Sequence, residues 1–216
     1  MSKSNKYGYS GVDIPTQAFK ANVGKFDPSE INELVADNKW TQYGQLELIE
    51  TQTVTSDVAT VSFDSIQESI YNVHFITVNN FQPTLDDRHL AFRLKVNGTT
   101  TTGFDYQYAM SQNNITNGGR EHRSGSDSKI WLAYNSSFNS GEGSSGYLYV
   151  YNAGDSSKYT FLTSQFSTFR NTAEIQTNFN SGVRKVAGAC DGFEFATSGG
   201  NITEGVFSCY GIKEYS

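Results

Sequence analysis

The stretch that decides the fold is Gly205-Val206-Phe207-Ser208-Cys209-Tyr210-Gly211-Ile212-Lys213. Successive side chains of a strand face opposite sides of a sheet, so Phe207 and Cys209 point to one face and their neighbours to the other. Only three residues follow this stretch. An aromatic strand left unpaired would be a template for aggregation. We therefore expect this strand to complete a sheet, and the opposite end of the chain to be the part that reaches outward.

The composition is typical of a β-rich protein. Of 216 residues, 18% are charged, while Gly (20), Phe (15) and Tyr (13) are frequent and Pro (3) is scarce. Aromatic and β-branched residues favour strands, and Gly, Asn and Ser favour polar turns. A chain of this length can form one all-β domain with a sizeable core.

The charge balance argues against two classes of partner. The formal net charge is −6 and no basic block occurs, so we expect no binding to nucleic acid. No apolar run is long enough to span a bilayer, so no membrane insertion is expected. Residues 1–6 lack the apolar stretch of a signal peptide, which predicts synthesis in a cytoplasm. There Cys190 and Cys209 would be reduced, and a disulfide between them is the less favoured alternative.

Residues 1–26 show neither a helical nor a strand period, and we expect them to be extended. The segment nevertheless has many apolar side chains for a solvated tail, namely Tyr7, Tyr9, Val12, Ile14, Phe19, Val23 and Phe26. Two interpretations remain open. The segment either packs over its own domain, or it is a docking arm that becomes ordered on a partner. The docking arm is slightly favoured.

A short helix is expected within residues 27–44. Asp27 is suited to cap the helix, Pro28 to occupy its first turn, and Glu30 to complete a capping box. Ile31 and Leu34 then start an apolar stripe. A helix of about three turns is too short to be stable alone in water, so it must pack on something.

An aromatic hinge around Trp40 leads from the helix into the next segment. If the arm and the helix attach the protein to a partner, their apolar side chains make the contact. The predicted partner-docking residues are Tyr7, Tyr9, Ile14, Phe19, Phe26, Ile31, Leu34 and Trp40.

Residues 45–216 contain the strands of a single domain. Alternating or β-branched segments occur at 45–54, 58–63, 71–78, 90–96, 103–110, 129–134, 147–151, 159–169, 173–179, 193–196 and 205–213. Asn97-Gly98 is a hairpin turn, residues 111–128 are expected to be a polar loop, and Glu47 and Glu50 are expected to face outward. The predicted fold is all-β: a jelly-roll-like antiparallel β-sandwich of roughly ten strands, preceded by an extended arm and one short α-helix.

The sequence contains no recognisable catalytic, metal or cofactor motif. The three histidines, His74, His89 and His122, form no zinc-binding spacing, and no Cys-x-x-Cys, Gly-x-Ser-x-Gly or phosphate-binding Gly-rich motif is present. We therefore expect a protein that is not an enzyme, with no cofactor and no metal. His74, in mid-strand, is expected to be a satisfied core residue.

Two groups of residues are candidates for ligand or receptor binding. Tyr147, Tyr149 and Tyr151 share one face of a strand, and Arg120 and His122 lie in the predicted loop. A second pair of tyrosines, at 106 and 108, also shares a strand face. Such rings can stack on sugars or pack against a neighbouring subunit, but pairing with neighbouring strands of their own sheet is the favoured interpretation.

The closing strand also carries a family resemblance. Phe207-Ser208-Cys209-Tyr210-Gly211-Ile212-Lys213 resembles the C-terminal strand of β-sandwich virion proteins of tailed bacteriophages, with Cys209 where that group commonly has Leu. The stretches 7–17, 39–54 and 71–81 are similar to structural proteins of marine phages, including those that infect cyanobacteria. This resemblance covers most of the chain, brings no catalytic residues with it, and does not indicate which part of the virion is involved.

The resemblance implies a virion structural protein, made in the host cytoplasm and attached to other virion proteins through the arm and helix. Tail fibre, tail adaptor and head decoration all remain open. Such proteins are commonly oligomeric, and a homotrimer is favoured. The alternative is a receptor- or carbohydrate-binding module that contacts host surface glycans. An enzyme such as a depolymerase is the least favoured class.

Overall fold

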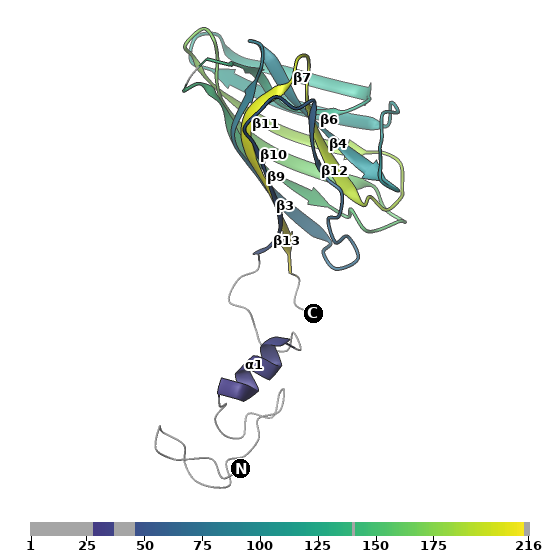
Figure 1. The fold of residues 1–216 in the computed structure, drawn as a ribbon. Helices are drawn as coiled ribbons and strands as arrows, with labels where there is room; N and C mark the ends of the chain where they lie inside the picture. Colours follow the sequence, from purple (N-terminus) through teal and green to yellow (C-terminus); the bar gives the residue numbers. More distant parts are fainter. Residues whose placement is uncertain (1–27, 37–45, 140, 214–216) are drawn as a thin grey trace. The chain divides into compact units, whose positions relative to one another are not determined.

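The computed structural model describes residues 28–36, 46–139 and 141–213 of the chain (Figure 1). Internal contacts divide the chain between residues 44 and 45 into two units, which are considered separately. In the first unit, α1 spans Pro28–Ala36, with Pro28 in its first turn. The predicted short helix is thus present, while its proposed cap Asp27 lies outside the described residues.

The second unit is built from strands. They are β1 (Leu46–Val54), β2 (Thr60–Phe63), β3 (Val73–Pro83), β4 (Arg88–Val96), β5 (Thr99–Thr100), β6 (Tyr106–Asn114), β7 (Gly118–Asp127), β8 (Ile130–Ser136), β9 (Gly143–Tyr151), β10 (Thr160–Phe169), β11 (Ile175–Arg184), β12 (Gly192–Thr197) and β13 (Ile202–Ile212). Every pairing between these strands is antiparallel. The fold is therefore an all-β sandwich, as predicted.

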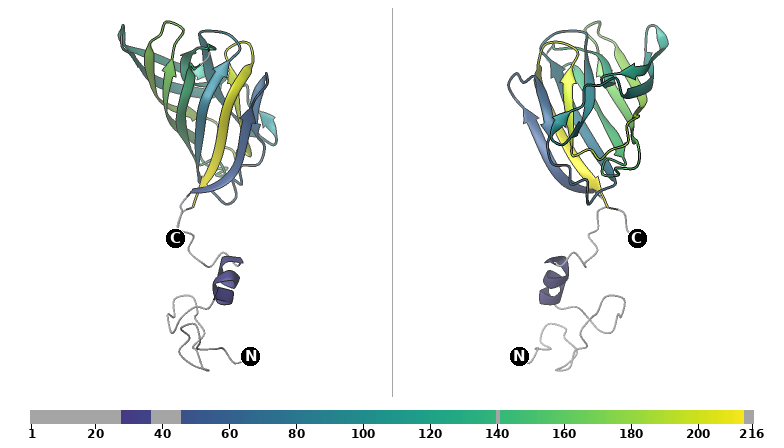
Figure 2. Two further views of the ribbon diagram at one scale, coloured as in Figure 1. Left: turned by 60° about the vertical axis from the view of Figure 1, so that its left-hand side comes forward. Right: turned by 90° about the vertical axis from the view of Figure 1, so that its right-hand side faces the viewer.

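The two sheets have jelly-roll topology. The large sheet has the order β1-β13-β3-β9-β10-β11-β6-β7, and the small sheet has the order β2-β12-β4-β5, with β8 also paired to β4. If β5–β7 and β10–β11 are set aside, the remaining strands form the four-stranded sheets β1-β13-β3-β9 and β2-β12-β4-β8. That arrangement is the double Greek key of a jelly roll. The two insertions extend the large sheet beyond β9, where β8 lies against β10 and β11 (Figure 2).

Phenylalanine rings form the centre of the core between the sheets. Phe195 of β12 packs against Phe207 of β13, with ring centroids 5.2 Å apart, and against Phe92 of β4 at 5.4 Å. Phe207 and Cys209 are completely buried, as the alternation of the closing strand predicts. His74 is also buried, and one ring nitrogen lies 2.8 Å from the carbonyl oxygen of Ile66.

One predicted loop is wrong. Residues 111–128 are not a polar loop but the greater part of a β-hairpin, in which β6 runs to Asn114 and β7 starts at Gly118. The Asn114 side chain accepts a hydrogen bond of 2.6 Å from the backbone N–H of Asn117 and closes the turn. Because β7 is the edge strand of the large sheet and is largely exposed, its polar residues show no apolar alternation that would reveal a strand.

Candidate functional site

The structure separates the two predicted groups of ligand-binding residues. Tyr147, Tyr149 and Tyr151 project from β9 on the outer face of the large sheet, whereas Arg120 and His122 belong to β7 at its edge. Three strands, β10, β11 and β6, lie between β9 and β7. His122 pairs with the buried Met110 and faces inward, away from the face that bears the tyrosines. The two groups therefore do not form one site.

The predicted docking residues fall mostly outside the described part of the chain. Ile31 and Leu34 lie in α1, where Ile31 is half-buried. The others, Tyr7, Tyr9, Ile14, Phe19, Phe26 and Trp40, are outside the described residues. Docking through residues 1–44 stays a prediction.

The tyrosines of β9 form a cluster with aromatic rings from two neighbouring strands. Phe75 of β3 lies at the centre, with its ring 4.8 Å from Tyr149, 5.9 Å from Tyr147 and 6.1 Å from Tyr210 of β13. Tyr149 also stacks on Tyr151 at 6.3 Å. Cross-strand pairing of these rings is thus present, as favoured from the sequence. We call the outward side chains of β1, β13, β3, β9 and β10 around Phe75 the outer aromatic face.

This face continues onto the strands on either side and is uncharged. Leu48 of β1 is 60% exposed and Phe161 of β10 is 47% exposed. Two rows of paired residues cross the five strands. One row is Leu46, Ile212, Val73, Tyr151 and Phe161, and the other is Leu48, Tyr210, Phe75, Tyr149 and Thr163. An uncharged surface rich in aromatic rings is the composition expected at the centre of a protein–protein interface.

Glu50 and Glu47 face inward, contrary to the prediction: Glu50 lies opposite the buried Cys209, and Glu47 faces the same side of the sheet. Glu47 is held there by its partners. It pairs with Gly211, whose missing side chain would meet the ring of Tyr71 on the inner side of the sheet. Its carboxylate accepts hydrogen bonds from the Tyr71 hydroxyl and, at 3.0 Å, from the Lys213 ammonium group. These bonds lower the pKa of Glu47. Because β1 is an edge strand, an inward carboxylate can be satisfied at the rim of the sandwich, and the leucines of β1 are left outside.

Inside the sandwich, a histidine stack lies beneath β6 and β7. The ring of Tyr134 is held between His89 at 4.2 Å and His122 at 4.1 Å, both in stacked geometry. His89 Nδ1 accepts a hydrogen bond of 3.1 Å from the backbone N–H of Asn135, and His122 Nε2 contacts Gln112 Oε1. Burial lowers the pKa of both histidines, so both rings are neutral near pH 7. Tyr108, expected to share a strand face with Tyr106, is likewise part of this interior.

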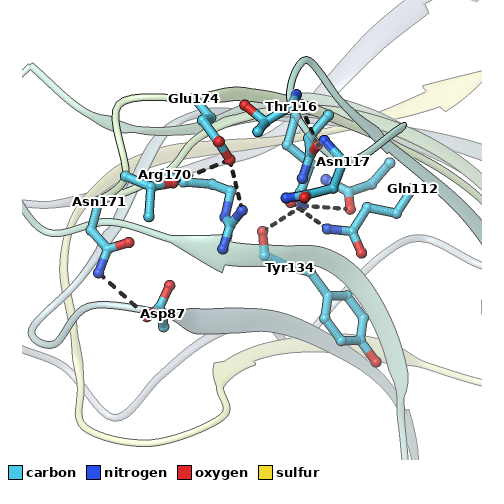
Figure 3. Close-up of polar contacts among 12 residues, drawn as sticks. Asp87, Gln112, Thr116, Asn117, Tyr134, Arg170, Asn171 and Glu174 are labelled. Carbon is cyan, nitrogen blue, oxygen red and sulfur yellow. Dashed lines mark hydrogen bonds and ion pairs between the residues drawn. The ribbon is translucent and has the colours of Figure 1, made fainter. Parts of the chain in front are cut away.

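Polar contacts tie together the loops at one end of the sandwich (Figure 3). Asn171 donates a hydrogen bond of 3.3 Å to Asp87, which joins the β10–β11 turn to the β3–β4 loop. Within the β10–β11 turn, Arg170 bonds Glu174 at 3.0 Å. A hydrogen bond from Thr116 is the largest cause of the lowered pKa of Glu174, and it reaches over from the β6–β7 turn. Three loops are thus linked by polar contacts.

The described residues contain no cluster of three or more His, Cys, Asp or Glu side chains that could hold a metal ion. Cys190 and Cys209 are free and buried, and burial raises the pKa of the Cys209 thiol to about 12. This thiol is therefore not a reactive nucleophile at neutral pH. No helix within the described ranges is long and apolar enough to cross a membrane.

Comparison with known proteins assigns the chain to no family. Searches against protein-family models, curated proteins and solved structures each found no significant match.

Proposed function

We propose that this chain is a non-enzymatic structural protein of a bacteriophage virion, in which residues 1–44 attach the sandwich to the particle. The resemblance of residues 207–213 and of the first half of the chain to phage virion proteins supports this role. Jelly-roll topology supports it further, because viral capsid and lectin domains use the same architecture. A tail fibre, a tail adaptor and a head decoration are all compatible with the proposal.

One geometric feature carries the proposal. β1 begins and β13 ends side by side, with Leu46 opposite Ile212, at what we call the entry end of the sandwich. Figure 2 shows these two strands together. The turns at 84–87, 115–117, 170–174 and 198–201 lie at the other end, which we call the loop end. The chain enters the sandwich at the entry end. Attachment through residues 1–44 would therefore leave the loop end free to contact a ligand or another protein.

The test is to delete residues 1–25 in the phage that encodes the chain. Because residues 45–216 form a unit with its own core, the truncated protein should remain soluble and melt at the same temperature. We expect mass spectrometry to find it in infected cells but not in purified particles. A matched control, Asn171→Ala at the loop end, should enter particles normally. Wild-type levels of the truncated protein in particles would reject the docking role, and absence of the full chain from particles would reject the virion role.

We further propose that the sandwich associates with copies of itself through the outer aromatic face, with a trimer favoured. Identical chains carry identical charges, and this chain has a formal net charge of −6. Contact between copies is most favourable where no charged side chain has to be desolvated. The outer aromatic face provides such a surface, with Leu48, Tyr147 and Phe161 each more than a third exposed.

A further inference from the structure

A groove of about 1000 Å³ lies at the loop end of the large sheet, beyond the outer aromatic face. Its floor is formed by β1, β13 and β3, and its rim by the segments after β1, β3 and β8. The lining residues used below are Thr53, Asp57, Asn79, Asn80, Phe138 and Glu204. We call this the bulge groove. Its volume lies at the upper end of the range for small-molecule sites.

Two β-bulges on neighbouring strands shape the floor. The pairing of β13 with β3 shifts on both sides of Glu204, and the pairing of β3 with β9 shifts between Val78 and Phe81. Within the second bulge, Asn80 adopts a left-handed backbone conformation with φ of 53°. Its side-chain nitrogen donates a hydrogen bond of 2.6 Å to Glu204 Oε1. Bulges interrupt the ladder and redirect side chains, and left-handed non-glycine residues concentrate at binding sites.

The rim presents an aromatic ring on an ordered support. Phe138 is 47% exposed, although its backbone N–H donates to Asp86 Oδ1 at 3.3 Å. The hydroxyl of Ser137 donates to the same oxygen at 2.8 Å. Gln82, buried below, donates to the carbonyl oxygens of Asn139 and Glu142 on the same loop. The backbone that carries the ring is therefore held in advance, which reduces the entropy that a ligand must remove when it binds.

The chemistry of the lining favours one class of ligand. Among the residues that the structure describes, no Lys, Arg or His lines the groove, and the carboxylates of Asp57 and Glu204 make it unfavourable for anions. The carboxylates are hydrogen-bond acceptors, the amide of Asn79 donates and accepts, and the hydroxyl of Thr53 does both. A sugar ring matches this set, because its hydroxyls both donate and accept along the edge while its C–H face is apolar and can lie on Phe138.

We propose that the bulge groove binds a neutral saccharide. Phe138 contacts the apolar face of the sugar, and Glu204, Asp57 and Asn79 bond its hydroxyls. The Asn80 amide holds the Glu204 carboxylate in place from within the bulge. The proposal does not depend on the virion role. Where that role also holds, the ligand is a host surface glycan and the loop end is the part of the protein that meets the cell.

The experiment applies the full chain to an array of purified bacterial glycans, both neutral and acidic, with an oligolysine peptide as a cationic probe. We expect binding to at least one neutral glycan. Phe138→Ala and Glu204→Gln should each lower the affinity for it at least tenfold. Glu204→Gln keeps an oxygen that can accept from Asn80, so it tests the charge without removing the internal bond. Phe179→Ala is the matched control, since this ring is 45% exposed on the same sheet but does not line the groove.

Three results would overturn the proposal: no neutral glycan bound, binding only to acidic glycans or to oligolysine, or a neutral glycan bound equally well by both groove variants. Melting temperatures of the variants should match that of the wild type, because Phe138 and Glu204 are exposed. If the wild-type chain binds no neutral glycan but enters particles normally, the groove alone is rejected. Glycan binding by a protein that is absent from particles would reject the virion role alone.

Discussion

Tyr134 lies between the imidazole rings of His89 and His122. Because both rings are partly buried, we expect the stability of the sandwich to be sensitive to acid. His89 and His122 are neutral in the folded state because burial lowers their pKa below the ordinary value of 6.5. The unfolded chain therefore binds protons first as the pH falls. The stabilisation is fully present above about pH 6.5 and is lost as the pH falls from there towards the folded-state pKa.

We predict that the free energy of unfolding decreases below about pH 6.5, with each histidine contributing at most ~1.4 kcal/mol per pH unit. The double variant His89→Phe/His122→Phe keeps two rings against Tyr134 but removes both titrating groups. Urea unfolding at pH 7.5 and 5.5 should show a shallower pH dependence for this variant than for the wild type. Equal pH dependence in the two proteins would show that the stack does not couple protonation to folding. His74 and the carboxylates are common to both proteins and cancel in the difference.

The closing strand offers a second test at the residue scale, because neighbouring aromatic residues face opposite sides. Phe207 is fully buried, 5.2 Å from the ring of Phe195, whereas Tyr210 lies partly exposed on the outer aromatic face. Phe207→Ala should reduce the free energy of unfolding by about 3–5 kcal/mol, the usual range for a buried phenylalanine. Tyr210→Ala should cost clearly less. Chemical denaturation of both variants measures the difference, and similar losses would contradict the assigned facing of β13.

Among the elements, the β6–β7 hairpin is the clearest departure from what the sequence predicts. Its edge strand, β7, pairs with β6 over the full length of the hairpin. Gly118 lies opposite Asn114 at the turn, and Asp127 lies opposite Tyr106 at the other end. We predict that backbone amides of β6 within residues 111–114 exchange with deuterium much more slowly than in an unstructured peptide, because β6 is paired on both sides. Hydrogen exchange read by mass spectrometry tests this. Exchange at the intrinsic rate would mean that the segment is the loop the sequence suggested.

The elements that sequence patterns predict well are those with one apolar face. The closing strand, with Phe207 and Cys209 inward, and the Asn97-Gly98 turn, where both residues have positive φ, follow from local rules. The edge strand β7 could not be predicted because its exposed polar residues carry no period. Neither could the orientation of Glu47, because that depends on Tyr71, which is 24 residues away in the chain.

The bulge groove was missed for a related reason. Glu204 and Asn80 are separated by 124 residues and meet only because β13 pairs with β3. A weak signal was nevertheless present in the sequence. Asn79-Asn80 and Gly205 interrupt two otherwise regular strands, and such interruptions indicate bulges. The sequence does not show that these interruptions lie next to one another and form a site, because that depends on the pairing of β13 with β3.

At the scale of the whole molecule, the large sheet has two surfaces of different character. Near the entry end its outer face is apolar and aromatic, while near the loop end it is hollowed by the bulge groove, whose lining includes Asp57, Asn79 and Glu204. An assembly that buries the first surface would leave the second one accessible. Self-association next to the entry end and ligand binding at the loop end are therefore compatible on a single sheet.

We predict that the full chain is a homo-oligomer and that Leu48→Glu converts it to single chains. Leu48 is 60% exposed, so a charge at this position leaves the isolated fold intact but would have to be buried in the assembly. Light scattering should give a multiple of 23.9 kDa for the wild type, with three copies favoured, and one copy for the variant. Thr60→Glu, on an exposed position of the small sheet, is the matched control and should leave the mass unchanged. A wild-type protein that stays a single chain at its highest soluble concentration, or a Leu48→Glu variant that still assembles, would reject self-association through the outer aromatic face.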